Sequence, residues 1–479
     1  MRTSTILASL AVGASAGTVS VPFVKSGFHH GASIEKRDTL DLEALNNITG
    51  GGYYAEFSIG TPPQNISFLL DTGSSDTWVN SKDTDLCHSK EAQQTNGYCM
   101  TTCKSYSYSE LVRDGTDTES LVNPDKSRTF KVVDRDGFDI RYLDTRRIEG
   151  DYFNDTVTID GKAVKQQQLG LAVKSVRPTG IMGLGFSANV AANKSYPAIV
   201  DNMVSQGLID TAAYSLWLND LSSDQGTVLF GGIDTQRFYG ELATLPLLPE
   251  STKSLNVTSF SVALKGLEVK TPKKPDGIKM DSLKKNTVAI LDSGSTVCLM
   301  PDAQVKEIYK AFDVLSVQDV NIPFVDCGYA KDKGKGINFD FEFDNKTISV
   351  PMSEMIVNAF PDNQDIFKDP RLDYYFKDWD GVCMFGISPS STYGVQTSTF
   401  TILGDTFLRS AYVVYDLANK QVGIAEAAHG KESKIVDLDA NSKLSAVSGL
   451  PEPENAAGHI SPVSLVSLIV AAGIALAAL

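Results

Sequence analysis

Histidine is scarce in this sequence, and several familiar catalytic motifs are missing. Only five histidines occur among the 479 residues, and neither H-E-x-x-H nor G-x-S-x-G is present. Zinc proteases and Ser-His-Asp hydrolases therefore lack their catalytic residues here. The stretch GIMGLG at 180–185 departs from the dinucleotide-binding pattern. We expect neither a cofactor nor a metal ion.

Clusters of lysine and arginine are also lacking. The formal net charge is −15, and the calculated pI is about 4.9. Because phosphate binding needs clustered cationic side chains, this composition argues against a nucleic-acid partner. An acidic balance instead suits solubility, or work, at low pH.

Helical periodicity is rare, whereas strand patterns are frequent. Short runs such as YYAEFSIG and SAYVVYDL are rich in β-branched and aromatic residues and are bounded by turn-forming residues. Helices are expected at 197–209 and at 301–312, where apolar residues recur at helical spacing. We therefore predict an all-β fold with a few short helices.

The N-terminus has the pattern of a secretory signal. Residues 1–16 combine one Arg, a short apolar stretch and a final A-x-A. Lys36 and Arg37 then form a dibasic pair, which processing proteases of the secretory pathway read. We expect a signal peptide at 1–16, a propeptide at 17–37 and a mature protein that starts at Asp38.

The C-terminal region changes in composition twice. Residues 431–455 lose the strand pattern and gain Pro, Glu and Ser, which predicts a linker or stalk. Residues 456–479 form a nearly unbroken apolar tail with no basic residue after it, which indicates a lipid-anchor signal that is removed, with attachment at Asn455. The tail is also long enough for a membrane span, but the missing Lys or Arg favours the anchor.

Cysteines and glycosylation sequons agree with secretion. Six cysteines permit 15 pairings, of which we predict Cys327–Cys383 and a bond from Cys87 to Cys99 or Cys103. Metal ligation by the Cys87 loop is a weak alternative, because no C-x-x-C pair exists. N-glycosylation is predicted at six sequons: Asn47, Asn65, Asn154, Asn193, Asn256 and Asn345.

The sequence contains an internal repeat. FLLDTGSS at 68–75 returns as AILDSGST at 289–296, and each copy is followed by an apolar pair and a glycine. Gly183 lies 112 positions after Asp71, and Gly404 lies 112 positions after Asp292. Two lobes built on one plan explain these equal intervals. We place the N-terminal lobe at 38–213 and the C-terminal lobe at 214–430.

Each copy of this repeat places an Asp directly after a predicted apolar strand. If an approximate two-fold axis relates the lobes, Asp71 and Asp292 meet and share one proton, because two like charges so close cannot both ionise in a sheltered cleft. The ionised carboxylate then takes a proton from a water molecule, while the protonated one donates to a peptide carbonyl oxygen. The neighbouring turn residues are predicted to support the pair through tight turns and hydrogen bonds: Thr72, Gly73, Ser74, Ser293, Gly294 and Ser295.

The two turns, with DTGSSDTWV and TILGDTFLRSAYVVYDL, resemble those of the pepsin-type aspartic endopeptidases. The resemblance covers residues 52–428 and is closest to the fungal secreted and surface-anchored branch that includes candidapepsins and yapsins. It implies a bilobal all-β fold with a long cleft, a β-hairpin flap over it, and hydrolysis of internal peptide bonds under acidic conditions. We expect a monomer whose partners are polypeptide substrates and, through its anchor, a membrane.

The resemblance also implies roles for residues of the flap. Tyr142 is aligned with the flap Tyr of the family, and Trp78 is similar to the Trp that hydrogen-bonds it. Asp144 matches a position where a family Asp faces a substrate Lys next to the scissile bond, so we predict tolerance of basic residues there, opposed by Arg146 and Arg147. The flap departs from the family pattern because Leu143 and Thr145 replace glycines.

A second function remains open from the sequence alone. The bilobal scaffold could serve as a catalytically silent binding or wall-organising protein at the cell surface, since a fold does not guarantee an activity. Both Asp residues, both turn glycines and the flap Tyr are present, whereas a decayed enzyme is expected to lose at least one of these. Hydrolysis of a denatured protein separates the two possibilities.

Overall fold

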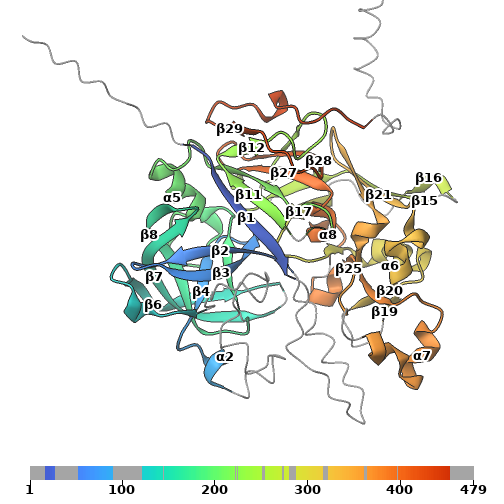
Figure 1. The fold of residues 1–479 in the computed structure, drawn as a ribbon, viewed down its shortest axis with the longest axis horizontal. Helices are drawn as coiled ribbons and strands as arrows, with labels where there is room; N and C mark the ends of the chain where they lie inside the picture. Colours follow the sequence, from blue (N-terminus) through green and yellow to red (C-terminus); the bar gives the residue numbers. More distant parts are fainter. Residues whose placement is uncertain are drawn as a thin grey trace, which may run out of the picture.

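A computed structural model describes most of the chain between the predicted signal peptide and the C-terminal tail. The described residues are 17–26, 52–89, 121–143, 145–177, 179–221, 223, 225–250, 254–271, 274–279, 287–316, 322–360, 364–395 and 397–453. Strands dominate, and the early and late parts of the chain form two bodies on either side of a shared sheet (Figure 1). This confirms the predicted all-β, bilobal architecture.

The largest sheet among the described residues has 14 strands and includes segments from both lobes. Its order is β13 (Ala243–Pro246), β28 (Gln421–Glu426), β27 (Ala411–Asp416), β10 (Ala213–Trp217), β11 (Gln225–Phe230), β1 (Val19–Ser26), β2 (Gly52–Ile59), β3 (Gln64–Asp71), β9 (Gly180–Gly183), β4 (Thr77–Ser81), β8 (Lys162–Lys174), β7 (Arg147–Ile159) and β6 (Lys131–Arg141), with β5 (Leu121–Val122) beside β4.

The C-terminal lobe adds smaller sheets. One has the order β14 (Ser261–Leu264), β17 (Thr287–Leu291), β26 (Phe400–Leu403), β18 (Cys298–Met300) and β25 (Ile387–Pro389). A second consists of β16 (Lys274–Lys279), β15 (Gly266–Thr271), β21 (Asn338–Glu342) and β22 (Thr347–Pro351), and a third of β19 (Leu315–Ser316), β20 (Pro323–Asp326), β24 (Val382–Phe385) and β23 (Ile356–Val357). The last pairs β12 (Gly232–Asp234) with β29 (Ile435–Asp437).

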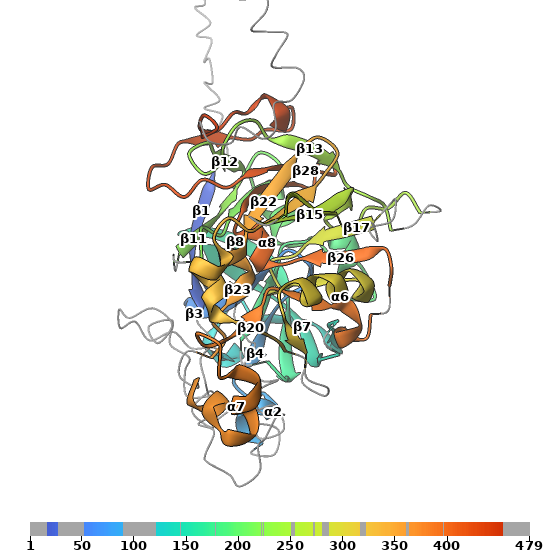
Figure 2. The same cartoon turned by 90° about the vertical axis from the view of Figure 1, so that its right-hand side faces the viewer.

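The helices are short, and α2 and α7 lie at the end of the molecule opposite β12 and β13 (Figure 2). The α-helices are α2 (Asp85–His88), α5 (Ile199–Ser205), α6 (Asp302–Ala311), α7 (Pro370–Phe376) and α8 (Asp405–Leu408). The 3₁₀ turns are η2 (Pro124–Lys126), η3 (Ser187–Asn189), η4 (Cys327–Ala330), η5 (Asp332–Gly334), η6 (Met352–Met355), η7 (Gln364–Lys368), η8 (Ser390–Tyr393) and η9 (Leu444–Ala446). In the part of the chain that the structure covers, no helix has the length and apolarity needed to cross a bilayer.

Both helices predicted from periodicity are present. Helix α6 buries Val305 and Ile308 on one face, as its spacing predicts. Helix α5 is shorter than predicted: it ends at Ser205, and Gly207 takes a left-handed backbone conformation with φ of +68°. A glycine in this conformation ends helices without a steric penalty.

Strand β1 comes from the segment predicted to be a propeptide, and it lies within the shared sheet. It pairs antiparallel with β11 from Val19 to Val24 and then with β2 from Val24 to Ser26. The side chains of Val19, Val21 and Phe23 are buried. Figure 1 shows β1 in dark blue, running between strands of both lobes. In this structure, β1 is therefore a hydrogen-bonded strand in the middle of the sheet.

Residues 431–453, most of the segment predicted to be a stalk, are attached to the rest of the protein. Residues 431–453 pack along the body: β29 pairs with β12, and Leu438 and Leu444 are buried. Single bridges join Tyr239 to Leu450 and Glu241 to Ser448. Leu438 and Leu444 belong to a core cluster of the C-terminal region, and Val447 packs against it, whereas Ile435 and Val436 are exposed.

The cysteines can be followed only in part. Cys327 and Cys383 form a disulfide that joins η4 to β24, as predicted, and Cys298 is a free, buried thiol. Cys99 and Cys103 lie outside the described residues, so the second predicted bond from Cys87 stays a prediction.

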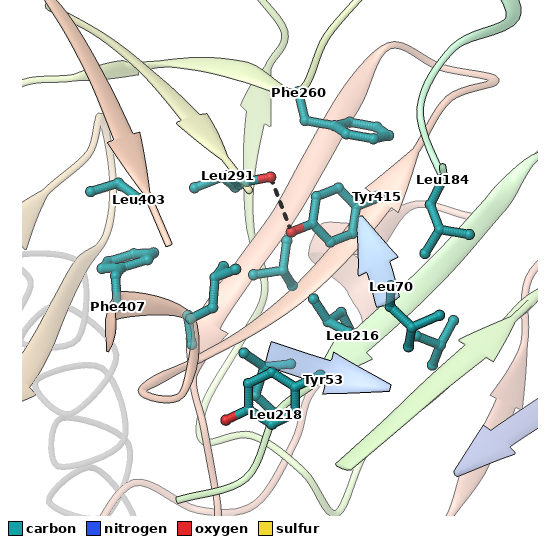
Figure 3. Packing of buried hydrophobic residues seen from close by; sticks show 14 of the residues in the cluster. Tyr53, Leu70, Leu184, Leu216, Leu218, Phe260, Leu291, Leu403, Phe407 and Tyr415 are labelled. Carbon is teal, nitrogen blue, oxygen red and sulfur yellow. Dashed lines mark hydrogen bonds between the residues drawn. The ribbon is translucent and has the colours of Figure 1, made fainter. Parts of the chain in front are cut away.

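A continuous hydrophobic core lies directly beneath the two repeated turns that contain Asp71 and Asp292. Figure 3 shows Leu70 and Leu291, which precede the two Asp residues, packed around Tyr415 of β27. The Tyr415 hydroxyl donates to the carbonyl oxygen of Leu291 at 3.5 Å. Leu184, directly after β9, and Leu403, at the end of β26, belong to the same cluster. Apolar packing therefore fixes the position of both turns from below.

Candidate active site

The two Asp-Thr/Ser-Gly turns have the same backbone plan. Strand β3 runs parallel to β9, with Asp71 opposite Gly183, and β17 runs parallel to β26, with Leu291 opposite Leu403. The later apolar-apolar-Gly segments are thus the neighbouring strands of the turns. The equal spacing found in the sequence reflects this repeated pairing.

Close backbone approach requires a glycine at Gly183, the last residue of β9, and at Gly404, directly after β26. A Cβ on Gly183 would lie 2.5 Å from the carbonyl carbon of Ser75, and a Cβ on Gly404 would lie 2.3 Å from the carbonyl oxygen of Ser295. No side chain fits at such distances from backbone atoms. Each glycine therefore allows its strand to support the Asp turn beside it.

Each carboxylate is held in the same way by its own turn. The Gly73 N–H donates to Asp71 Oδ1 at 2.8 Å, and the Ser74 hydroxyl donates to Asp71 Oδ2 at 2.5 Å. In the other lobe, the Gly294 N–H donates to Asp292 Oδ1 at 2.8 Å, and the Ser295 hydroxyl donates to Oδ2 at 2.7 Å. These donors fix the rotamers of both carboxyl groups.

The structure brings the two carboxyl groups together. Asp71 and Asp292 lie within hydrogen-bonding reach of each other. A Cβ on Gly73 would lie 2.4 Å from Asp292 Oδ1, and a Cβ on Gly294 would lie 2.4 Å from Asp71 Oδ1. Each turn glycine thus lies against the carboxylate of the opposite lobe. The two carboxyl groups have room only because neither glycine has a side chain.

Burial and like charge change the proton affinity of this pair. Asp292 is 8% exposed, and this desolvation, together with the negative charge of Asp71, raises the pKa of Asp292 to about 7. The hydrogen bonds from Ser295 and Gly294 act in the opposite direction and are outweighed. Asp292 therefore holds a proton in acidic solution beside a second carboxyl group.

Thr72 and Ser293 join the two turns across the lobe junction. The Thr72 N–H donates to Ser293 Oγ at 3.2 Å, and the Ser293 N–H donates to Thr72 Oγ1 at 3.0 Å. The two hydroxyls then donate to the carbonyl oxygens of Leu291 and Leu70, at 2.8 and 2.9 Å. All four bonds are buried, so they set the separation of the two carboxyl groups.

The hairpin of β6 and β7 forms the predicted flap. Its turn is closed by the Tyr142 N–H, which donates to the carbonyl oxygen of Arg146 at 2.9 Å. Trp78 is fully buried, and its indole N–H donates to the Tyr142 hydroxyl at 2.7 Å, as expected. Thr145 has φ of +67°, a conformation that is costly for a β-branched residue and that a glycine would take freely.

An open cleft of about 530 Å³ runs over the Asp pair and beneath the flap. Tyr54, Leu69 and Ile181 line one wall, and Val297, Leu299 and Ile402 line the other. Apolar side chains from both lobes therefore line the cleft beside polar residues such as Ser388 and Thr392, as suits an extended chain with side chains on both sides.

Two flap residues point in different directions. Arg146 lines the cleft, whereas Arg147 lies on the outer side and pairs with Asp139 and Glu149. Asp144, for which we predicted a contact with a substrate Lys, lies outside the described residues.

Sequence reasoning missed two features near the flap. Asp76 is 1% exposed and accepts hydrogen bonds from the hydroxyls of Tyr152 and Tyr196, at 2.9 and 2.7 Å, which ties β4 to two other segments. Arg177 lies over the ring of Tyr142, with Cζ 5.1 Å from the ring centroid. Neither contact has a local sequence signal, because the partners are far apart in the chain.

The structure describes only some of the predicted glycosylation and anchor sites. Asn65, Asn193, Asn256 and Asn345 are exposed. Asn154 is half-buried on β7, and its Oδ1 is buried without a hydrogen bond. Asn47 and the anchor residue Asn455 lie outside the described residues.

Comparisons with known proteins agree with this geometry. Residues 52–427 match the model of the family described as eukaryotic aspartyl protease. The chain is 35% identical over 410 residues to the probable aspartic-type endopeptidase OPSB of Arthroderma benhamiae, a match that covers 84% of this chain and 73% of the relative. It is 29% identical over 410 residues to secreted aspartic protease 6 of Candida albicans, covering 85% and 83%, and 27% identical over 428 residues to barrierpepsin of Saccharomyces cerevisiae, covering 85% and 66%.

Proposed function

Because the chain belongs to the eukaryotic aspartyl protease family, we propose that it is a secreted, surface-anchored aspartic endopeptidase that hydrolyses internal peptide bonds in acidic solution. One observation carries the proposal: two carboxyl groups from matching turns lie within hydrogen-bonding reach of each other at the floor of an open cleft. Asp71 and Asp292 are the proposed catalytic residues.

The proposed reaction begins with a water molecule bound between the two carboxyl groups. Asp71 takes a proton from the water as its oxygen attacks the peptide carbonyl carbon, and Asp292 gives its proton to the carbonyl oxygen. The resulting tetrahedral diol then collapses. The C–N bond breaks, Asp71 returns its proton to the leaving nitrogen, and Asp292 recovers a proton from a diol hydroxyl. Both residues end in their starting states, and no covalent intermediate with the protein forms.

The raised pKa of Asp292 supports work in acidic solution. The attack step needs one protonated and one ionised carboxyl group. Burial and the charge of Asp71 keep Asp292 protonated up to a pH of about 7. Above this pH, the proton that the carbonyl oxygen requires is lost.

Secretion is supported by the sequence and by the likeness to secreted aspartic protease 6 of Candida albicans, and anchoring is supported by the sequence. The signal at 1–16, the dibasic pair before Asp38 and the sequons fit export and processing of an inactive precursor. The apolar tail at 456–479 fits replacement by a lipid anchor at the outer face of the cell membrane or in the wall.

Digestion of a denatured protein near pH 4 tests the activity. We expect the processed wild-type protein to cleave it, a statine-type inhibitor to block cleavage, and Asp292→Asn and Asp71→Asn to reduce the rate by about 10²-fold or more. Circular dichroism must show that both variants are folded. A folded wild-type protein that cleaves nothing would instead establish the silent cell-surface scaffold.

A further inference from the structure

Asp76 is a buried carboxyl group that the proposed reaction does not use. It directly follows the turn that contains Asp71, it precedes β4, and it is 1% exposed. Its carbonyl oxygen accepts a hydrogen bond from the Gly183 N–H at 3.2 Å, and Gly183 lies opposite Asp71 in the parallel pairing of β3 and β9. The backbone therefore fixes the position of Asp76 relative to the Asp pair.

Three neutral donors converge on the Asp76 carboxyl group. Oδ1 accepts hydrogen bonds from the hydroxyls of Tyr152 and Tyr196, at 2.9 and 2.7 Å, and Oδ2 accepts one from the Ala191 N–H at 2.6 Å. Among the described residues, no Lys or Arg pairs with this group. Burial raises the pKa of Asp76, and the three hydrogen bonds oppose that rise. The ionised carboxylate can accept all three bonds at once, which satisfies its buried oxygens.

The hydrogen bond from Tyr152 is the one that connects Asp76 to the flap. Tyr152 lies on β7, and its ring meets the ring of Phe138 on β6 edge-on, with the ring centroids 5.3 Å apart. Phe138 packs in turn against Trp78, with the centroids 6.3 Å apart. Burial, followed by the charge of Asp76, raises the pKa of Tyr152, so its hydroxyl remains a donor. Both strands of the flap hairpin are therefore held through Tyr152.

The flap is thus attached at two points to one short stretch of chain. Trp78 donates to the Tyr142 hydroxyl beside the flap turn, and Asp76, two residues before Trp78, binds Tyr152 further along the hairpin. A hairpin that is held at one point can pivot about it, whereas two attachments also fix its angle. Reacting groups must be held within about 0.5 Å of the productive geometry, so the angle of the flap affects the rate.

We propose that Asp76 is a positioning residue for peptide hydrolysis: through the Tyr152 hydroxyl, it sets the angle at which the flap holds a substrate against the Asp pair. The inference rests on the proposed function. Asp76 is not among the described residues that line the cleft, so it acts through Tyr152 and not by touching the substrate. Loss of this attachment therefore weakens the transition state more than it weakens substrate binding.

Tyr152→Phe tests the attachment by removing one hydroxyl and keeping the ring. In the processed protein, kcat, KM and the affinity for a statine-type inhibitor are measured at pH 6, about two units above the ordinary pKa of an Asp. We expect kcat to fall about tenfold with KM changed less than about twofold, and the inhibitor to bind about tenfold more weakly.

Tyr196→Phe is the matched control. It removes a hydroxyl from the same carboxylate oxygen, but Tyr196 lies outside the flap hairpin. The two variants should therefore lose similar stability in thermal unfolding, whereas kcat of Tyr196→Phe should stay within about twofold of the wild type. Values of kcat are expressed per folded molecule, so a loss of stability alone does not change them.

A double-mutant cycle shows whether Asp76 and Tyr152 act together. Asp76→Asn keeps the shape of the side chain but presents a single acceptor oxygen to three donors, so we expect it to lower kcat as well. Adding Tyr152→Phe to Asp76→Asn should then lower kcat less than about twofold further, because the attachment is already lost.

Three outcomes overturn the proposal. The first is an unchanged kcat in Tyr152→Phe, and the second is an equal loss of kcat in Tyr152→Phe and Tyr196→Phe, which would mean that the network only stabilises the lobe. The third is a cycle in which the effects of Asp76→Asn and Tyr152→Phe multiply. A folded wild-type protein that cleaves no peptide contradicts the proposed function instead, so the two failures are distinguishable.

Discussion

At the scale of a single residue, Asp292 is a buried carboxyl group next to a second one. Its pKa affects both the activity and the stability of the protein. Its pKa is raised to about 7, first by desolvation and then by the charge of Asp71. A group whose pKa is raised on folding binds its proton more tightly in the folded state, so the folded state loses stability as pH rises from the unfolded value through about 7.

We therefore expect the free energy of unfolding to decrease between pH 4 and pH 7 by up to about 4 kcal/mol, since each pKa unit corresponds to about 1.4 kcal/mol. Asp292→Asn removes the titrating group and should flatten this slope. Urea unfolding at several pH values measures it. In parallel, kcat/KM of the wild type should fall above an apparent pKa near 7. Equal slopes in both proteins would contradict the assignment.

The hydroxyl of Thr72 makes two buried hydrogen bonds across the lobe junction. Thr72→Val keeps the shape of the side chain but leaves the Ser293 N–H and the Leu291 carbonyl oxygen without this partner. We expect a loss of about 2–4 kcal/mol in unfolding free energy and a lower kcat. Thr158→Val on β7, whose side chain makes none of these contacts, is the control. Unchanged stability and kcat in Thr72→Val would show that the junction bonds are dispensable.

At the scale of an element, β1 has the clearest consequence. Phe23 is fully buried, its ring meets that of Tyr53 edge-on at 5.2 Å, and a Cβ on Gly226 would lie 2.2 Å from it. The strand therefore stabilises the precursor strongly, although its residues belong to the proposed propeptide.

Phe23→Ala is expected to destabilise the precursor by about 3–5 kcal/mol, because it leaves a cavity in the sheet. The precursor can be kept intact with Lys36→Ala and Arg37→Ala. After cleavage at the dibasic pair, the substitution should have no effect, because we expect residues 17–37 to dissociate. Thermal unfolding of both forms measures this. An equal effect in the processed protein would mean that β1 stays bound after cleavage.

At the scale of the whole molecule, the late segment 431–453 closes one end of the fold. Figure 1 shows it in red, running across the top of the molecule near β12 and β28. It buries Leu438 and Leu444 and supplies the partner of β12. The catalytic body therefore extends past the boundary predicted at residue 430.

Truncation after Gly430 should cost about 2–4 kcal/mol, from two buried leucines less the entropy regained by the removed chain. Truncation after Pro453 should leave stability unchanged. Thermal unfolding of the two shortened proteins makes the comparison. If both unfold at the temperature of the longer chain, the segment is the loosely attached stalk that its composition predicts.

The sequence by itself determined the parts of this protein that depend on local or repeated patterns. The repeat of FLLDTGSS as AILDSGST identified Asp71, Asp292 and their supporting turns, because each turn needs fixed residue types at fixed spacing. Helix α6 followed from its apolar period. Tyr142 and Trp78 came from a resemblance, and their hydrogen bond agrees with it.

Only the tertiary structure decided the placement of Arg177 over Tyr142, the sharing of Asp76 by two tyrosines, and the docking of β1 and β29. These contacts join residues that are far apart in the chain. They depend on which surfaces complement each other after the lobes have folded, and composition does not record that complementarity. A Pro- and Glu-containing segment can still be held by two leucines, and a segment predicted to be a propeptide can still provide a central strand.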